Sequence, residues 1–269
     1  MSTARKPRAV LGRFIASDYQ PTALRAHVYA ELRRALLDGV FVPGETLSLR
    51  SIADALGTSP MPVREAVGRL VAEGALEISD RRTIALPFLT REQFEELSEL
   101  RIELEGSITE RSVRRNGGNL APALEELEQR SVVARRRSLT ERLALNRQFH
   151  FTIYRAAGCE LRLRIIELLW LQSASLIHMS LAKASPQAAG QNHRALIAAV
   201  KAGDPLGARR AVEADIDETY QHLLAITAFP TERPGAVPGP TQPSGATSAA
   251  GLSSSALGAL GGPREGGLQ

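Results

Sequence analysis

Apolar residues recur every three or four positions through most of this chain, which is the spacing of helices that bury one face. Near the N-terminus the pattern breaks at Gly39, at Gly57 and at Gly74, and beyond Gly74 it changes to two short strand-like runs around Asp80. The elements predicted for this part are helices at 22–38, 49–56 and 60–73 and strands at 75–79 and 83–87. Three helices followed by a hairpin predict a small winged domain over 21–88.

The rest of the ordered chain carries the helical spacing almost without a strand signal. Breaks at glycine- and proline-containing positions divide it into separate segments. The predicted helices lie at 91–115, 121–137, 140–157, 160–183, 186–202 and 205–228. Six helices in about 140 residues predict an all-α bundle over 89–229, so the chain is expected to be mainly α with two domains.

The turn between the second and third helices has the residues that helix ends require. Ser48 can cap the second helix, and Gly57 stands where a left-handed residue closes it. Ser59 is a suitable N-cap for the third helix, and Pro60 falls at its first position, where a missing N–H costs nothing. Pro62 still lies within the first turn, where amide groups lack intrahelical partners. The two prolines are therefore compatible with a helix start.

One side of the third helix is polar or small, and it lies opposite the apolar side. It consists of Met61, Arg64, Glu65, Gly68, Arg69 and Ala72. Arg64 lies one turn from the N-terminus, where a recognition helix meets base edges and an arginine can donate two hydrogen bonds to guanine. The Ser59 hydroxyl and the helix N-terminus suit a phosphate. The alternative is a helical hairpin with solvated arginines.

Two segments carry a resemblance to the DNA-binding domain of GntR-type regulators. They read GVFVPGETL at 39–47 and PVREAVGRLVAEGAL at 62–76, and the similarity covers about 65 residues. The resemblance implies a winged helix-turn-helix in which Arg50 and Arg64 are the main DNA-contacting arginines. Many members have an arginine where this chain has Pro60, so one base contact is missing or comes from elsewhere. The residues predicted to contact DNA are Arg50, Ser59, Met61, Arg64, Gly68, Arg69, Arg81 and Arg82.

Composition and charge predict a polyanionic partner, the cellular compartment and the character of the two chain ends. The 269 residues carry a net charge of +4, and residues 1–88 hold 12 Lys or Arg against 9 Asp or Glu, which suits a polyanion. The single Cys159 excludes an internal disulfide framework. No signal core or membrane span is expected, so we predict a cytoplasmic protein. Residues 1–20 are predicted to be a flexible arm, and 230–269, where 15 of 40 residues are Gly or Pro, a disordered tail.

Several inward positions of the predicted bundle are polar. Asn146 and His150 are four residues apart on one helix, His193 lies on another, and Asp215 lies on the last. A buried carboxylate needs a partner, and two imidazoles, a carboxylate and an amide oxygen are a ligand set for a divalent metal. The alternative is an Asp–His hydrogen-bond network without metal.

The helix order, with NRQFH at 146–150 and NHRALIAAVKAGD at 192–204, resembles the FCD effector domain of the FadR-like branch of GntR regulators. This similarity spans most of 91–226. It implies a metal site built from D-x-x-x-H and two further histidines. Here the corresponding residues are Asn146, His150, His193 and Asp215, so a carboxylate has changed places. The resemblance implies a divalent ion such as Zn, Ni, Mn or Fe.

Two more residues are candidates for effector binding. Arg101, in ELRIELEG, matches the R-x-x-LE segment of the resembled domain and could hold a carboxylate, or it could pair with Glu105 on its own helix. His178 is either an effector-lining or a core histidine. Trp170 is expected in the core or a subunit interface, and His222, near the end of the last helix, is expected to be solvated.

Together these features predict a transcriptional regulator, not an enzyme. We expect a homodimer that binds a palindromic operator in double-stranded DNA, acts as a repressor, and responds to a small organic acid in the helical domain. No membrane partner is expected. Two rivals remain: an effector-independent DNA-binding protein with a closed pocket, and a metal-dependent enzyme built on the bundle.

Overall fold

The computed structural model describes residues 21–41, 46–78, 83–87, 89–134, 137–183 and 190–229. The predicted N-terminal arm and C-terminal tail lie outside these residues. Arg81 and Arg82 also lie outside them, so the structure gives no account of their predicted contacts with DNA.

Three helices form the N-terminal domain: α1 (Pro21–Leu37), α2 (Leu49–Leu56) and α3 (Pro60–Ala72). Helix α3 packs against both α1 and α2. The apolar side chains that they bury form one core, which includes Val28, Leu32, Leu36, Ile52, Val63, Leu70 and Ile84. Of these, Val28, Leu32, Leu36, Val63 and Leu70 are positions that the helical spacing predicted to face inward, and the opposite side of α3 is left exposed.

A small antiparallel sheet lies beside these helices. Its strands are β1 (Thr46–Leu47), β2 (Glu77–Ile78) and β3 (Ile84–Ala85), in the order β1-β3-β2. The register pairs Leu47 with Ile84 and Ile78 with Ile84. The hairpin β2–β3 was predicted, whereas β1 was not, because two residues are too short to show an alternating pattern.

The predicted helix ends in the turn are confirmed. Ser48 and Ser51 form a capping box at the start of α2, and Gly57 closes α2 with φ = 63°, in the left-handed region that favours glycine. Ser59 is the N-cap of α3 with an extended backbone, and Pro60 is its first helical residue. The Ser59 side chain makes no capping hydrogen bond to the helix, so its hydroxyl is available to another partner.

The C-terminal domain is helical throughout the described residues. It consists of α4 (Arg91–Asn116), a 3₁₀ turn η3 (Gly117–Leu120), α5 (Ala121–Ala134), α6 (Leu139–Ala156), α7 (Glu160–Lys183), α8 (Gln191–Lys201) and α9 (Pro205–Ile226). Six α-helices confirm the predicted bundle. Helix α5 ends three residues earlier than predicted, and α8 begins five residues later.

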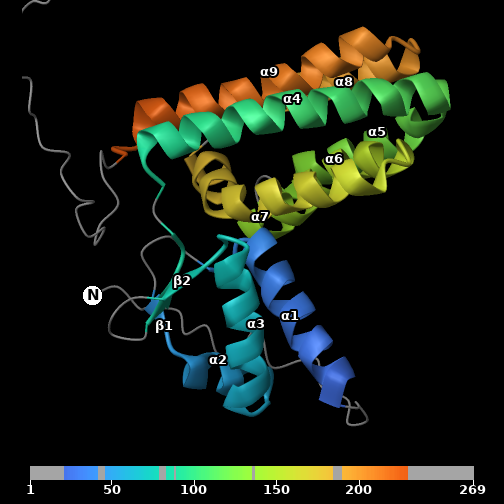
Figure 1. Ribbon diagram of the computed structural model, residues 1–269. Helices are drawn as coiled ribbons and strands as arrows, with labels where there is room; N and C mark the ends of the chain where they lie inside the picture. Colours follow the sequence, from blue (N-terminus) through green and yellow to red (C-terminus); the bar gives the residue numbers. More distant parts are fainter. Residues whose placement is uncertain are drawn as a thin grey trace, which may run out of the picture. The chain divides into compact units, whose positions relative to one another are not determined.

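The bundle is layered. Figure 1 shows α4 and α9 packed along one another over α6 and α7, and α8 contacts both α9 and α5. The core between the layers includes Ile108, Phe149, Ile153, Ile166, Trp170 and Val212. Helix α7 is long and apolar enough by length and composition to cross a membrane, with a mean hydropathy of 1.4 in its most apolar window. Half of that window is buried inside the bundle, which accounts for its apolar character.

Candidate functional site

The exposed side of α3 carries the predicted recognition residues. Met61 is 61% exposed, and Arg64 and Gly68 are exposed on the same side. A Cβ added at Gly68 would meet no atom within 4 Å, so this part of the helix is open to a close partner. Within the described chain, neither Arg64 nor the exposed Arg50 on α2 makes a hydrogen bond or an ion pair. Two guanidinium groups are therefore available on this surface.

Arg69 is placed differently from Arg64, although both are exposed. Its Nε donates to Glu73 Oε1 at 3.0 Å, and its guanidinium lies 3.8 Å from the ring centroid of Tyr29. The Tyr29 hydroxyl donates to the same Glu73 carboxylate. Burial, followed by this hydrogen bond, raises the pKa of Tyr29. The structure thus gives Arg69 a role in fastening α3 to α1, and a contact with DNA would be additional.

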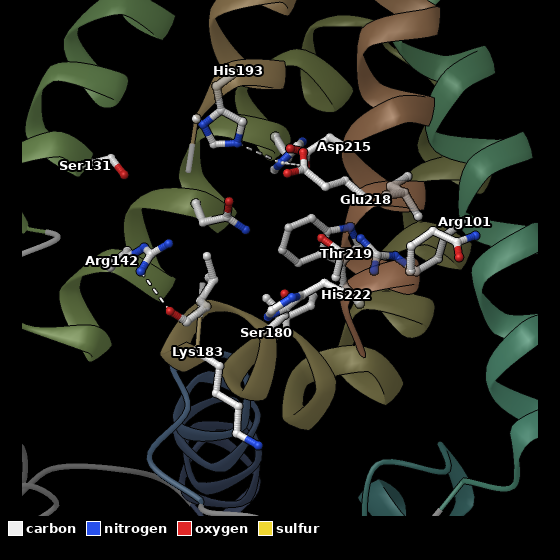
Figure 2. A pocket seen from close by; sticks show the side chains of 18 residues that line it. Arg101, Ser131, Arg142, Ser180, Lys183, His193, Asp215, Glu218, Thr219 and His222 are labelled. Carbon is white, nitrogen blue, oxygen red and sulfur yellow. Dashed lines mark hydrogen bonds and ion pairs between the residues drawn. The ribbon is translucent and has the colours of Figure 1, made fainter. Parts of the chain in front are cut away.

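A cavity of about 580 Å³ lies inside the helical domain. This is within the usual range for a small-molecule site. Helices α4 to α9 all contribute to its wall, and Figure 2 shows the side chains that line it. The lining includes residues singled out from the sequence, namely Arg101, Asn146, His150, His193, Asp215 and Trp170.

Three metal-ligating side chains converge at this cavity from three helices. His150 comes from α6, His193 from α8 and Asp215 from α9, and one potential ligand atom of each lies within 4.8 Å of the others. His150 Nε2 is 3.3 Å from Asp215 Oδ2 and 3.3 Å from His193 Nε2. Asn146 lies one turn before His150 on α6 and lines the same cavity. The structure thus assembles the residues that the sequence pattern grouped.

Hydrogen bonds behind His150 determine which ring nitrogen faces the cluster. Glu105 is fully buried and accepts the Tyr154 O–H at 2.6 Å, the Trp170 N–H at 2.9 Å and the Arg101 Nε–H at 2.7 Å. Tyr154 has donated its only proton, so its oxygen accepts from His150 Nδ1, 3.1 Å away. Burial and the Glu105 charge raise the pKa of Tyr154 well above 10, which keeps the phenol protonated. When the ring is neutral, His150 Nε2 therefore points its lone pair at the cluster.

His193 is oriented in a similar way. Its Nδ1 lies 2.9 Å from Glu128 Oε2, and a carboxylate can only accept, so Nδ1 carries the proton. The ring also stacks on Phe149, with centroids 4.0 Å apart. With both rings neutral, two Nε2 atoms and the Asp215 carboxylate then face one another as acceptors. Such a set requires a cation between its members, either a shared proton or a metal ion.

The charge of Asp215 agrees with this arrangement. Burial alone would raise its pKa, but a proton on His150 Nε2, which is then the cation shared within the cluster, donates a hydrogen bond to the carboxylate, and this bond and the positive charges of His193 and Arg101 outweigh burial, so the net pKa is lowered from 3.8. Its side chain remains 27% exposed, on the cavity side. Asp215 is thus ionised at neutral pH and accessible from the cavity.

Arg101 forms the pair with Glu105 that was one of the two roles considered for it, and it also lines the cavity. Its Nε pairs with Glu105, and its guanidinium lies 5.1 Å from the ring centroid of Trp170. Arg101 nevertheless lines the cavity, with a side chain that is 10% exposed. Because the Nε edge is occupied, the terminal N–H groups are those that can reach a ligand carboxylate.

Comparisons with known families match both domains. Residues 24–86 match the family described as bacterial regulatory proteins, gntR family, and residues 96–218 match the FCD domain. This chain is a GntR-family regulator with an FCD domain. It is therefore a DNA-binding transcriptional regulator, and α2 and α3 are its helix-turn-helix.

Relatives of this regulator align along most of its length. It is 28% identical over 208 residues to the transcriptional regulator McbR of Escherichia coli K12, covering 76% of this chain and 92% of McbR. It is 24% identical to the transcriptional repressor RspR of the same organism, covering 79% and 94%. The solved structure of McbR superimposes with a TM-score of 0.65 over 76% of this chain and 96% of McbR. A GntR regulator from Rhodococcus shares the fold with a TM-score of 0.62 at 20% identity.

Two histidines of this regulator lie elsewhere than expected. His178, a candidate for effector binding, is absent from the described cavity lining and packs against Gly39 at the end of α1, where an added Cβ would lie 2.6 Å from its Nδ1. His222, expected to be solvated, lines the cavity, and its Nε2 is buried without a hydrogen-bond partner among the described residues. Helix periodicity gave the face of each residue but not the neighbouring helix.

Sequence reasoning also missed three residues around the cavity, namely Tyr154, His222 and Glu128, and the sequence holds a signal for the first two. Tyr154 is four residues after His150, and His222 is seven after Asp215, so each continues an inward stripe already identified. Glu128 shows no such signal, because its partner His193 is 65 residues away. Glu105 was considered only as a partner of Arg101, yet it also joins Tyr154 and Trp170.

Proposed function

We propose that this regulator binds a small organic acid in the FCD cavity, with a divalent metal ion as part of the site, and that the bound acid changes its affinity for DNA. The observation that carries the proposal is the convergence of His150 Nε2, His193 Nε2 and Asp215 Oδ2, three atoms that are all acceptors when both imidazoles are neutral. A ring of acceptors at the wall of a cavity favours a cation.

The residues proposed to hold the ion are His150, His193 and Asp215, with the amide oxygen of Asn146 as a fourth candidate. Zn, Ni, Mn and Fe all accept such a mixed set of nitrogen and oxygen ligands. When bound, the ion supplies a Lewis-acidic position for a ligand carboxylate. Arg101 lines the same cavity and offers a second, bidentate contact to that carboxylate.

On the DNA side, we propose that Arg64 and Arg50 contact bases and that the free Ser59 hydroxyl contacts a phosphate. A homodimer would place two such N-terminal domains on the two halves of a palindromic operator, as dimeric regulators of this type do. We also propose that this chain acts in the cytoplasm as a repressor. The relative RspR is named a transcriptional repressor, which supports the second part of this proposal. The acid can relieve repression only if its affinity differs between the DNA-bound and the free arrangement.

Metal content and acid binding test the effector site directly. The full chain, purified without chelator, should contain one divalent ion per protomer, which chelation removes. Asp215→Asn should weaken metal binding by at least about tenfold, since it replaces the anionic ligand of the set by a neutral amide. Asp217→Asn, two residues away on the exposed side of α9, is the matched control and should bind metal normally.

The effect of the acid on DNA binding is the second measurement. An operator selected from random duplexes should be released when an effective acid is added to the wild type. His150→Ala combined with His193→Ala should bind the operator unchanged and ignore the acid. A double variant that still responds would place the effector site elsewhere. A wild type without metal, and without stabilisation by any acid of a broad panel, would support effector-independent DNA binding instead.

A further inference from the structure

Polar groups line the cavity on two separate sides. Figure 2 shows His193 and Asp215 on one side, and Ser180, Lys183 and His222 on the opposite side. The apolar side chains of Trp170, Ile177 and Ile216 contribute to the wall as well. The metal-ligating cluster therefore accounts for only one of the two polar sides.

His222 is the residue on the second side that most needs a partner. Its Nε2 is buried and makes no hydrogen bond to any residue in the described ranges. A buried polar atom without a partner costs free energy, and native structures rarely leave one unsatisfied. Because His222 lines the cavity, a ligand atom can satisfy its Nε2. Ser180, 7% exposed, lines the same side and adds a hydroxyl.

The charges of the lining indicate which ligand group belongs on this side. Lys183 contributes a positive charge to this end of the lining, although its side chain is exposed and points away from His222 in Figure 2, whereas the carboxylates of the described lining, Asp215 and Glu218, both come from the part of α9 that precedes His222. Glu218 accepts a hydrogen bond from Asn192, so its charge is directed toward α8. An ammonium group and a histidine favour an anionic group beside them.

The register of α9 sets the separation between the two sides. Asp215 and His222 are seven residues apart on the same helix face, which corresponds to a rise of about 10 Å. If Arg101 or the proposed ion holds the first acid group at the level of Asp215, and His222 Nε2 donates to the second at about 2.8 Å, roughly 5 Å remains between the two acid groups of a ligand. An acyclic chain of four to six carbons spans that distance.

We propose that the effector is a dicarboxylic acid of four to six carbons, and that His222 determines this specificity. One carboxylate occupies the side of Arg101, His150, His193 and Asp215. The other accepts hydrogen bonds from His222 and Ser180 beside Lys183. This proposal rests on the proposed acid-binding function and adds the second anchoring point of the ligand.

Calorimetry on the full chain with added Zn²⁺ tests the inference with two series of acids. The first comprises malonate, succinate, glutarate and adipate, and the second comprises monocarboxylates of the same chain lengths. At least one diacid of four to six carbons should bind about tenfold or more tightly than its monoacid, because it gains a hydrogen-bonded charged contact. His222→Leu should remove this advantage while leaving the dissociation constants of the monoacids within twofold.

His222→Gln is the matched variant, because its amide can place a donor near the position of Nε2. This variant should retain most of the preference for diacids. A variant whose fold is disturbed would instead lose binding of both the diacids and the monoacids. Equal binding of both series by the wild type overturns the inference and leaves acid binding intact. Equal weakening of both series by His222→Leu also overturns it. If neither the diacids nor the monoacids bind, both this inference and the acid-binding function are overturned.

Discussion

Glu105 is predicted to be the residue on which the ligand site depends most for its stability. Its carboxylate is fully buried and accepts hydrogen bonds from Arg101 on α4, Tyr154 on α6 and Trp170 on α7. Glu105→Ala leaves all three donors without their acceptor, and one of them is a guanidinium with a side chain only 10% exposed. The three helices that frame the cavity then lose their common partner.

The magnitude follows from the groups that are left behind. Removing one partner of a buried ion pair costs about 3–5 kcal/mol. Each neutral donor left buried and unsatisfied costs about 1–3 kcal/mol. These costs are not additive in one network, and Arg101 can take water from the cavity. We therefore expect Glu105→Ala to lower the free energy of unfolding by about 4 kcal/mol or more.

Urea unfolding measures this loss, followed by far-UV circular dichroism and by the fluorescence of Trp170, the single tryptophan of the chain. Glu103→Ala is the control, because Glu103 is exposed on the same helix and should change stability by less than about 0.5 kcal/mol. Glu105→Gln keeps the shape and one acceptor, and should fall between the two. A loss below about 1 kcal/mol for Glu105→Ala, with an unchanged dependence on urea, would refute the reasoning.

Three further predictions concern both domains. Arg64→Ala should relax base preference at one operator position by about 1–3 kcal/mol, measured by competition with substituted duplexes; unchanged preference would exclude Arg64 from base contact. Gly68→Ala should stabilise the N-terminal domain by about 0.5–1 kcal/mol, because Gly68 is in a helix interior and a Cβ added there would meet open space. Gly68→Leu should fold but bind the operator at least tenfold more weakly, and normal binding would mean that another face contacts DNA. Burial lowers the pKa of His178 below 6.5, and the nearby Gly39 backbone offsets only part of this. The unfolded chain therefore binds the proton more readily, so stability falls as pH falls below 6.5. Between pH 7.5 and 5.5, the Tm of the His178→Gln variant should therefore fall less than the Tm of the wild type. An equal fall in both proteins would count against the buried position of His178.

Features determined by neighbouring residues could be predicted from the sequence. The turn between α2 and α3 is an example, because Gly57, Ser59 and Pro60 act within a few residues of one another. The strand β1 could not be predicted in this way. Thr46 and Leu47 become a strand only by pairing with Ala85 and Ile84, almost forty residues later. A short strand depends on its partner more than on its own composition.

The same distinction applies to the ligand site. Periodicity placed His150, His193 and Asp215 on inward faces, and the packing of α6, α8 and α9 brings those faces together. It placed His178 on an inward face as well, but that side of α7 meets Gly39 and not the cavity. A helix in a bundle has several inward neighbours, and the period of 3.6 residues does not choose among them.

The exchanged carboxylate has a consequence for the choice of ion. The metal-binding domains that this one resembles combine one aspartate with three histidines, whereas this chain offers His150, His193, Asp215 and the amide of Asn146. Both sets carry one negative charge, so the electrostatic attraction for a divalent ion is retained. One imidazole nitrogen has been replaced by an oxygen. Imidazole favours Zn, Ni and Fe, while oxygen ligands suit Mn. The exchange therefore shifts the preference of the proposed site toward ions such as Mn that favour oxygen ligands, and it leaves the negative charge of the ligand set unchanged.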